Sequence, residues 1–197
     1  MGLQADLVRL PLQTDHYSTA QRRIIRAALD LFAIHGVSGT SLQMIADSIG
    51  VTKAAVYHQF KTKEEIVLAV AAVELSRLET ALATAEAESS DTQARALLLE
   101  QVIGLAVERR QWVYALQNDP AMIRLLSENE PFLDLMNRLY SVLNGEDPTT
   151  ETRVRTAILS AAFGGAVVHP LVADLDDDTL RFEMLRTARR LFNLPDH

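Results

Sequence analysis

The side chains best suited to recognition chemistry in this 197-residue chain lie close together, at positions 52 to 63. The ammonium group of Lys53 can pair with a guanine edge, and the methyl group of Ala55 can touch that of a thymine. Lys63 stands at the predicted start of a helix, where its charge and the free backbone N–H groups can hold a phosphate. These residues are suited to binding nucleic acid rather than to breaking bonds.

Two short helices joined by a tight turn would position these side chains. Thr40 is expected to cap the first helix, with Gln43 three residues later as the second half of a capping box. Gly50 can take the left-handed conformation of a sharp turn, and Thr52 can cap the second helix. A small residue at Ala46 lets the two helices cross closely, as a helix-turn-helix requires.

The second helix of this pair is expected to read DNA. It should run from Thr52 to about His58, and its early side chains, Thr52, Lys53 and Ala55, would face the major groove. Two alternatives stay open at this point. Thr52 can act as a cap alone, and Lys53 can contact phosphate instead of a base edge.

The rest of the chain also predicts helices, since no segment alternates convincingly like a strand. A capping box at Ser18 and Gln21 opens a helix that should stop at Gly36, before a loop over 37–39. Further helix starts are expected at a Thr62–Glu65 box, at a Ser90–Gln93 box, and at Pro120, Pro131, Thr149 and Asp176–Asp178. The fold class is therefore all-α: an N-terminal three-helix bundle with the helix-turn-helix, and a larger C-terminal helical domain.

Composition argues against several other classes of protein. The chain has no cysteine, which excludes disulfides and thiolate metal sites and fits a reducing cytoplasm. No apolar stretch approaches the ~20 residues needed to span a membrane. The five histidines lack ligand spacing, and no catalytic arrangement is visible, so we expect a cytoplasmic protein with no enzyme activity, metal or cofactor.

Charge is distributed unevenly along the chain. Residues 1–66 carry a net charge of +1, whereas residues 67–197 carry −8, which together give the formal charge of −7. An acidic body behind a near-neutral head can repel DNA except at the intended face. Acidity is also common among cytoplasmic proteins, so the charge alone does not decide the function.

Residues 22 to 70 resemble the tetracycline-repressor (TetR) family of bacterial transcriptional regulators. The resemblance rests on the segments RRIIRAALDLFAIHG and TSLQMIADSIGVTKAAVYHQFKTKEEIVLAV. It implies a homodimer that binds a palindromic double-stranded DNA operator and usually represses until a small molecule enters the C-terminal domain. The expected organisation is a flexible arm (1–17), a DNA-binding domain (18–65) and an effector-binding and dimerisation domain (66–197).

The resemblance also implies roles for further residues. Tyr57 and His58 match family positions that contact phosphates, although the ring of Tyr57 can instead belong to the core. Such contacts fix the register on the duplex without reading sequence. The full expected DNA-binding set is Thr40, Ser41, Gln43, Thr52, Lys53, Ala55, Tyr57, His58 and Lys63.

Large apolar side chains in the second domain can form plain core or enclose a ligand cavity. We expect a hydrophobic or aromatic effector, with candidate contacts at Trp112, Tyr114, Met122, Phe132, Met136, Tyr140 and Phe163. Small residues allow close helix approach in the last two helices, so a dimer contact is expected at Ala161, Gly165, Leu180, Met184, Ala188 and Leu191. The alternative is a tight contact within one monomer. The alternatives are the same DNA-binding fold without an effector and, less favoured, a helical enzyme or carrier that uses the cavity.

Overall fold

The computed structural model describes residues 16–195, and all regular structure in that range is helical. The chain forms two compact units. Among the described residues, unit 1 contains 16–76 and 115–133, and unit 2 contains 77–114 and 134–195. The predicted all-α fold is confirmed.

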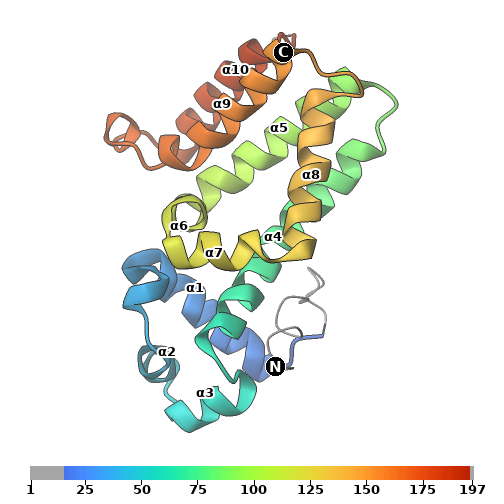
Figure 1. Cartoon of the computed structure of the whole chain (residues 1–197). Helices are drawn as coiled ribbons and strands as arrows, with labels where there is room; N and C mark the ends of the chain where they lie inside the picture. Colours follow the sequence, from blue (N-terminus) through green and yellow to red (C-terminus); the bar gives the residue numbers. More distant parts are fainter. Residues whose placement is uncertain (1–15, 196–197) are drawn as a thin grey trace. The chain divides into compact units, whose positions relative to one another are not determined.

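Unit 1 is built on α1 (Thr19–Gly39), α2 (Leu42–Ser48), α3 (Lys53–Gln59) and the first half of α4 (Lys63–Glu86) (Figure 1). It also holds α7 (Pro120–Ser127) with the end of α6 (Arg110–Asn118) and the start of α8 (Glu130–Asn144). Its core contains Phe32, Ile45, Val56 and Ile66, each at most 1% exposed. These are the apolar positions that the helical spacing of the sequence brings together.

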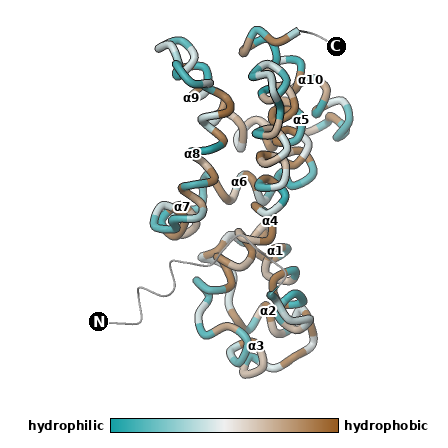
Figure 2. The backbone as a smooth tube through the Cα atoms, turned by 90° about the vertical axis from the view of Figure 1, so that its right-hand side faces the viewer, coloured by the Kyte–Doolittle hydropathy of each residue, from teal (hydrophilic) through white to brown (hydrophobic). Residues whose placement is uncertain are grey.

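Unit 2 contains the second half of α4, α5 (Asp91–Glu108), most of α8, α9 (Thr150–Ala166), a short 3-10 turn (Pro170–Val172) and α10 (Asp177–Leu191). Helix α10 packs on α5. Apolar and polar residues are interleaved along the helices of both units (Figure 2).

Several predicted helix starts are confirmed in detail. The amide of Gln21 donates to the Ser18 hydroxyl, and the Gln21 side chain accepts from the Ser18 amide, which completes the capping box. Asp119 caps α7 with Pro120 at its first position, and Thr149 and Asp176 cap α9 and α10. Ser90 is the N-cap of α5 but makes no side-chain capping bond, so the box predicted there is wrong.

Two further details differ from the prediction. Gly36 does interrupt α1, with φ +69° and ψ 169°, but residues 37–39 resume a helical turn instead of forming a loop. Helix α5 ends at Glu108, and the backbone of its C-cap, Arg109, leaves the helical region (φ −125°, ψ 36°). Helix α6 begins at the next residue without a proline or glycine to mark the break.

The predicted domain boundaries fall within continuous structure. Helix α4 runs through residue 65, and unit 1 extends to Ser76. The assignment of separate roles to 18–65 and 66–197 stays a prediction. Residues 1–15 of the predicted arm lie outside the described residues, while Tyr17 is 5% exposed and belongs to the core of unit 1.

A three-residue ion cluster joins α4 to α8 in unit 2. The Arg138 guanidinium donates twice to the Glu86 carboxylate, at 3.0 and 2.6 Å, and once to Glu79 at 2.5 Å. These hydrogen bonds lower the pKa of Glu86 and raise that of Arg138. A bidentate arginine–carboxylate pair of this kind fixes geometry as well as charge.

Arg138→Met is therefore expected to lower the free energy of unfolding by about 1–2 kcal/mol at pH 7, measured by urea denaturation. Because the folded pKa of Glu86 is lowered, the stabilisation is complete above the ordinary glutamate pKa of 4.5 and is lost as pH falls through the folded value. Arg186→Met, at an exposed pair with Glu183, is the control. An equal loss in both variants, or a difference that does not shrink in acid, would contradict the assignment.

Candidate nucleic-acid interface

The turn between α2 and α3 has the geometry that its glycine predicts. Gly50 has φ +68°, its amide donates to the carbonyl of Asp47 at 3.2 Å, and the Val51 amide donates to that of Ala46 at 3.0 Å. This pair of bonds is a Schellman motif, which satisfies the last carbonyls of a helix. Ala46 is fully buried, and α2 packs directly on α3. The predicted helix-turn-helix is therefore present.

Helix α3 is held by one face and presents the other. Val56 and the C-cap residue Phe60 are 0% and 4% exposed and anchor it in the core of unit 1. The Thr52 hydroxyl accepts from the Ala55 amide at 3.2 Å, so the predicted cap is confirmed. The side chains that remain exposed are Thr52, Lys53, Ala54, Ala55, Tyr57 and His58.

Tyr57 lies on the surface rather than in the core. It is 54% exposed, and the ammonium group of Lys61 lies 5.4 Å from its ring centroid. His58 is also exposed, with its Nδ1 atom 3.2 Å from the side-chain amide of Gln59. The structure thus provides hydrogen-bonding groups at both positions. It also exposes Lys61, a cation outside the contact set expected from the sequence.

The start of α2 differs from the prediction. Its N-cap is Ser41, whose hydroxyl accepts from the Met44 amide at 3.2 Å, and not Thr40. Thr40 is 2% exposed and donates to the carbonyl of Gly36 at 2.8 Å, because it closes the end of α1. We therefore leave Thr40 out of the proposed DNA contacts. Ser41 and Gln43 are exposed, and the Gln43 amide donates to Asp47 at 2.7 Å.

Lys63 is partly buried at the first position of α4. Its ammonium group donates to the carbonyls of Val37 at 2.8 Å and Thr40 at 3.2 Å. Because an ammonium has three donors, one is left for a phosphate. The amide of Glu65 donates to the Thr62 hydroxyl, which confirms the predicted cap. The Glu65 carboxylate, however, accepts from the backbone amide of Lys61 rather than from that of Thr62.

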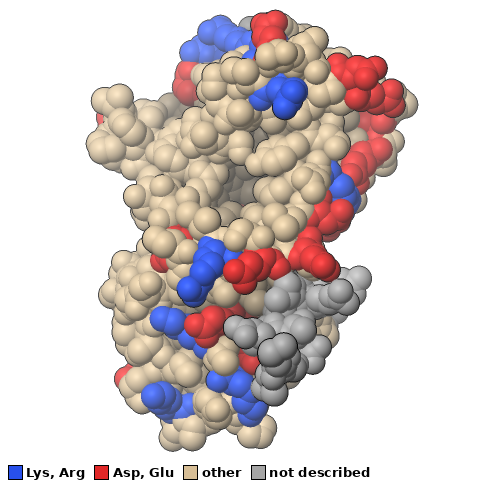
Figure 3. All heavy atoms as spheres, in the orientation of Figure 1, with Lys and Arg blue, Asp and Glu red and all other residues tan. Residues whose placement is uncertain are grey.

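Positive charge accompanies this motif. On the face drawn in Figure 3, lysine and arginine side chains occur around the helix-turn-helix part of unit 1, and acidic side chains line an edge of unit 2. Arg22, Arg23 and Arg26 on α1 are exposed, and Arg23 donates to the carbonyl of Ile49 at the end of α2. A cationic surface with an exposed helix is suited to the phosphate backbone of a duplex.

The seven predicted effector residues lie in both units. Phe132 and Met122 belong to unit 1, and Trp112, Tyr114, Met136, Tyr140 and Phe163 belong to unit 2. Trp112, Met122 and Phe163 are buried, whereas Tyr114 is 45% exposed. The hydroxyl of Tyr140 lies 3.0 Å from that of Ser160, within unit 2.

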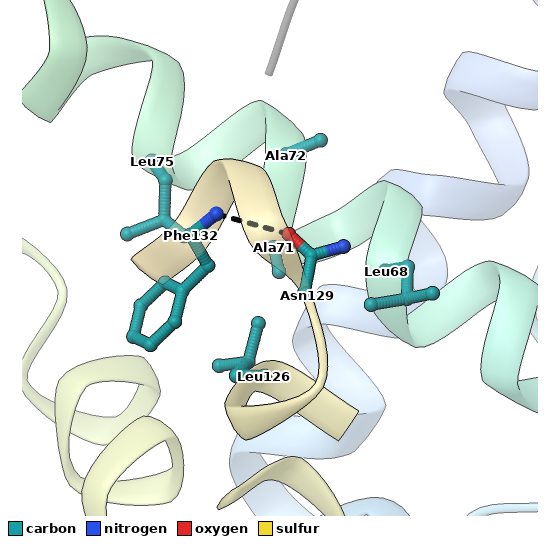
Figure 4. A pocket seen from close by; sticks show the side chains of 7 residues that line it. All are labelled: Leu68, Ala71, Ala72, Leu75, Leu126, Asn129 and Phe132. Carbon is teal, nitrogen blue, oxygen red and sulfur yellow. Dashed lines mark hydrogen bonds between the residues drawn. The ribbon is translucent and has the colours of Figure 1, made fainter. Parts of the chain in front are cut away.

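Unit 1 contains a small pocket lined mostly by apolar side chains. Phe132 is the member of the predicted effector set that lines it (Figure 4). The amide of Phe132 donates to the side-chain oxygen of buried Asn129 at 3.0 Å, which holds the start of α8 against the pocket. The other lining residues are Leu68, Ala71, Ala72, Leu75 and Leu126.

The predicted dimer residues have different environments. Leu180 and Ala188 are each 2% exposed, because α10 packs on α5 within the chain, so their assignment to a dimer surface is wrong. Ala161 is exposed, and the three others, Gly165, Met184 and Leu191, are partly exposed. Larger apolar side chains that the prediction missed are exposed on α9 and α10: Val154 at 52%, Ile158 at 56% and Phe182 at 60%.

Other kinds of site are not found in residues 16–195. This range contains no group of three or more histidine, aspartate or glutamate side chains placed to hold a metal ion. Within the same range, no helix has the length and apolar character needed to cross a membrane.

Comparisons with known proteins agree with this geometry. Residues 24–70 match the family described as "Bacterial regulatory proteins, tetR family". The chain is 48% identical to the HTH-type transcriptional regulator SrpR of Pseudomonas putida over 52 residues, which cover 26% of this chain and 24% of that protein. It is 30% identical to the HTH-type transcriptional repressor AcnR of Corynebacterium diphtheriae over 61 residues, 31% of this chain and 32% of that protein.

The likeness in fold extends further than the likeness in sequence. A crystal structure of a tetR-family bacterial regulatory protein from Rhodococcus RHA1 superposes with a TM-score of 0.66 at 18% identity, covering 91% of this chain and all of that one. SrpR and AcnR match over less than a third of their own lengths, in the segment that contains the helix-turn-helix. These relatives and structural neighbours are regulators rather than enzymes. The segment of this chain that contains the helix-turn-helix, residues 24–70, therefore belongs to the tetR family of bacterial regulatory proteins.

Proposed function

We propose that this protein is a DNA-binding transcriptional regulator that binds a palindromic operator as a homodimer. The observation that carries the proposal is α3, a helix anchored by Val56 and Phe60 whose remaining surface exposes Lys53, Ala55 and Tyr57. In a helix-turn-helix the early residues of this helix meet base edges. The proposed contact set is Ser41, Gln43, Thr52, Lys53, Ala55, Tyr57, His58, Lys61 and Lys63.

The homodimer is supported by a face of α9 in unit 2. Val154, Ile158 and Ala161 are exposed and lie four and three residues apart, so they share one side of the helix. A contiguous apolar face that is left exposed is typical of an interaction surface. In a homodimer with a two-fold axis, this face would pack against the same face of the partner subunit. The operator would then have the same two-fold symmetry.

Repression and release by a small apolar effector complete the proposal. AcnR, similar to this chain over its DNA-binding segment, is named a repressor. The apolar pocket at Leu68, Leu75 and Phe132 lies in the same unit as the helix-turn-helix, so a ligand there can favour one arrangement of that unit. The alternative is the same regulator without an effector, which a thermal-shift screen followed by operator release would distinguish.

Selection of bound sequences from random duplex DNA tests the function. We expect an inverted repeat whose half-sites lie ~34–36 Å apart, or a multiple of this distance, because each subunit places one α3 in a major groove. Affinity for that duplex should fall steeply with salt, and Lys63→Ala should reduce the slope by about one unit for each phosphate that Lys63 neutralises. Recovery of no sequence, with weak binding that is equal for all duplexes, would reopen the carrier or enzyme alternative.

A further inference from the structure

Three helices of unit 1 meet at the segment 36–40, directly before α2. Gly36 interrupts α1 with a backbone conformation that L side chains rarely adopt. The interruption turns the Val37 amide out of the α1 ladder. The Thr40 hydroxyl donates to the carbonyl of Gly36, and the Thr40 amide donates to that of Val37 at 3.3 Å. Residues 36–40 thus form a corner that determines where α2 begins, since the next residue, Ser41, is the N-cap of α2.

Asp119 holds one side of the corner. Its Oδ2 atom accepts from the Val37 amide at 2.9 Å, across 82 residues of sequence. Its Oδ1 atom caps α7 by accepting from the amides of Ala121 at 2.9 Å and Met122 at 3.3 Å. One carboxylate thus joins the start of α7 to the end of α1. A Cβ atom at Gly36 would lie 3.2 Å from Asp119 Oδ2, so this close approach also favours glycine there.

Lys63 holds the opposite side of the same residue. Its ammonium group donates to the Val37 carbonyl at 2.8 Å and to the Thr40 carbonyl at 3.2 Å. Val37 itself is 2% exposed. Hydrogen bonds to ionised groups in a partly buried setting are among the stronger ones in proteins. Val37 is therefore held through both its N–H and its C=O by oppositely charged side chains from α4 and from the turn before α7.

We propose that Asp119 and Lys63 form a clamp on Val37 that positions the helix-turn-helix, and that Asp119 is a positioning residue for DNA binding although it contacts no DNA. Asp119 belongs to residues 115–133, the segment of the later chain that lies in unit 1. A shift of this segment would move the corner from which α2 starts. The inference deepens the proposed function, because it names the contact through which the later chain acts on α2 and α3.

Asp119→Ser separates this role from simple capping. Serine caps helices about as well as aspartate, so α7 keeps its cap, but its single short hydroxyl cannot also reach Val37. Hydrogen exchange of the DNA-free protein should show about tenfold faster exchange at Val37 and through α2, with α4 amides near Ile66 unchanged. Asp176→Ser, the same change at the cap of α10, should leave the α2 amides unaffected.

Two results would overturn the clamp: unchanged exchange at Val37 and α2 in Asp119→Ser, or an increase equal to that in α4, which indicates global destabilisation. Lys63→Gln tests the other side of the clamp. In the double variant, the exchange rates of the α2 amides should increase by less than the product of the two single increases, because both bonds hold the same residue. A multiplicative result would show that the two side chains act independently and contradict the clamp.

DNA binding then distinguishes positioning from contact. On the selected duplex, Asp119→Ser should weaken affinity about five- to tenfold while the salt dependence keeps its slope, because every cationic side chain that meets a phosphate is still present. Unchanged affinity would contradict the positioning role. If wild-type protein binds no duplex, the proposed function fails, whereas the exchange measurements still decide whether the clamp exists.

Discussion

Lys53→Glu is expected to lower affinity for the selected operator by at least about 100-fold at a fixed salt concentration. Lys53 is exposed at the first position of α3, where recognition-helix side chains meet the duplex. Removing a base or phosphate interaction costs ~1–3 kcal/mol per subunit, the dimer has two such sites, and the new carboxylate faces phosphates. Fluorescence anisotropy with labelled duplex measures the change.

Arg124→Glu provides the matched control for Lys53→Glu. It makes the same change in net charge at an exposed position of α7, outside the helix-turn-helix. Its affinity should stay within about threefold of wild type, because exposed charges more than about 10 Å from the duplex are largely screened at 0.1 M salt. Equal losses in both variants would mean that overall charge, and not the surface of α3, determines binding.

Ile158→Asp is expected to convert the dimer to a monomer at micromolar concentration. Ile158 is 56% exposed and shares a face of α9 with Val154 and Ala161. A two-fold interface would bury the new carboxylate twice, and a buried unpaired charge costs several kcal/mol. The dissociation constant of the dimer should therefore rise at least about 100-fold, as measured by sedimentation equilibrium.

The control for this surface uses the same substitution. Ile34→Asp introduces aspartate on α1, where the isoleucine is 73% exposed, and should leave the assembly unchanged. If Ile158→Asp sediments as wild type does while both variants remain folded, the α9 face is not the dimer contact. Loss of the dimer in both variants would indicate general destabilisation instead.

Local sequence signals predicted the caps and the turn of α1, α2 and α3 well. Gly50, Thr52 and the Ser18–Gln21 box specify turns and caps through bonds between near neighbours, so their geometry follows from spacing. Thr40 and Ser41 were the exception. Both can cap, and in the structure the Thr40 hydroxyl donates to the carbonyl of Gly36, which leaves Ser41 to cap α2.

Contacts between distant residues were not predictable in this way. No pattern near Val37 indicates that Asp119 accepts its amide, or that Lys63 uses two donors within the chain. The dimer prediction failed at Leu180 and Ala188 for a related reason. The apolar stripe of α10 signals burial, but the sequence does not distinguish burial on α5 from burial on a partner. Val154 and Ile158 are exposed on α9, which is why the dimer contact is proposed there and not on α10.

The absence of cysteine from the sequence allows a direct test of the surface that α3 presents. Ala55→Cys would place a unique thiol on the exposed face of α3, and Ser127→Cys would place one at the exposed end of α7. Alkylation rates should be similar in the free proteins. With saturating operator duplex, the thiol at position 55 should react at least about tenfold more slowly, while that at 127 keeps its rate. Equal alkylation at position 55 with and without bound duplex would show that α3 does not face the DNA.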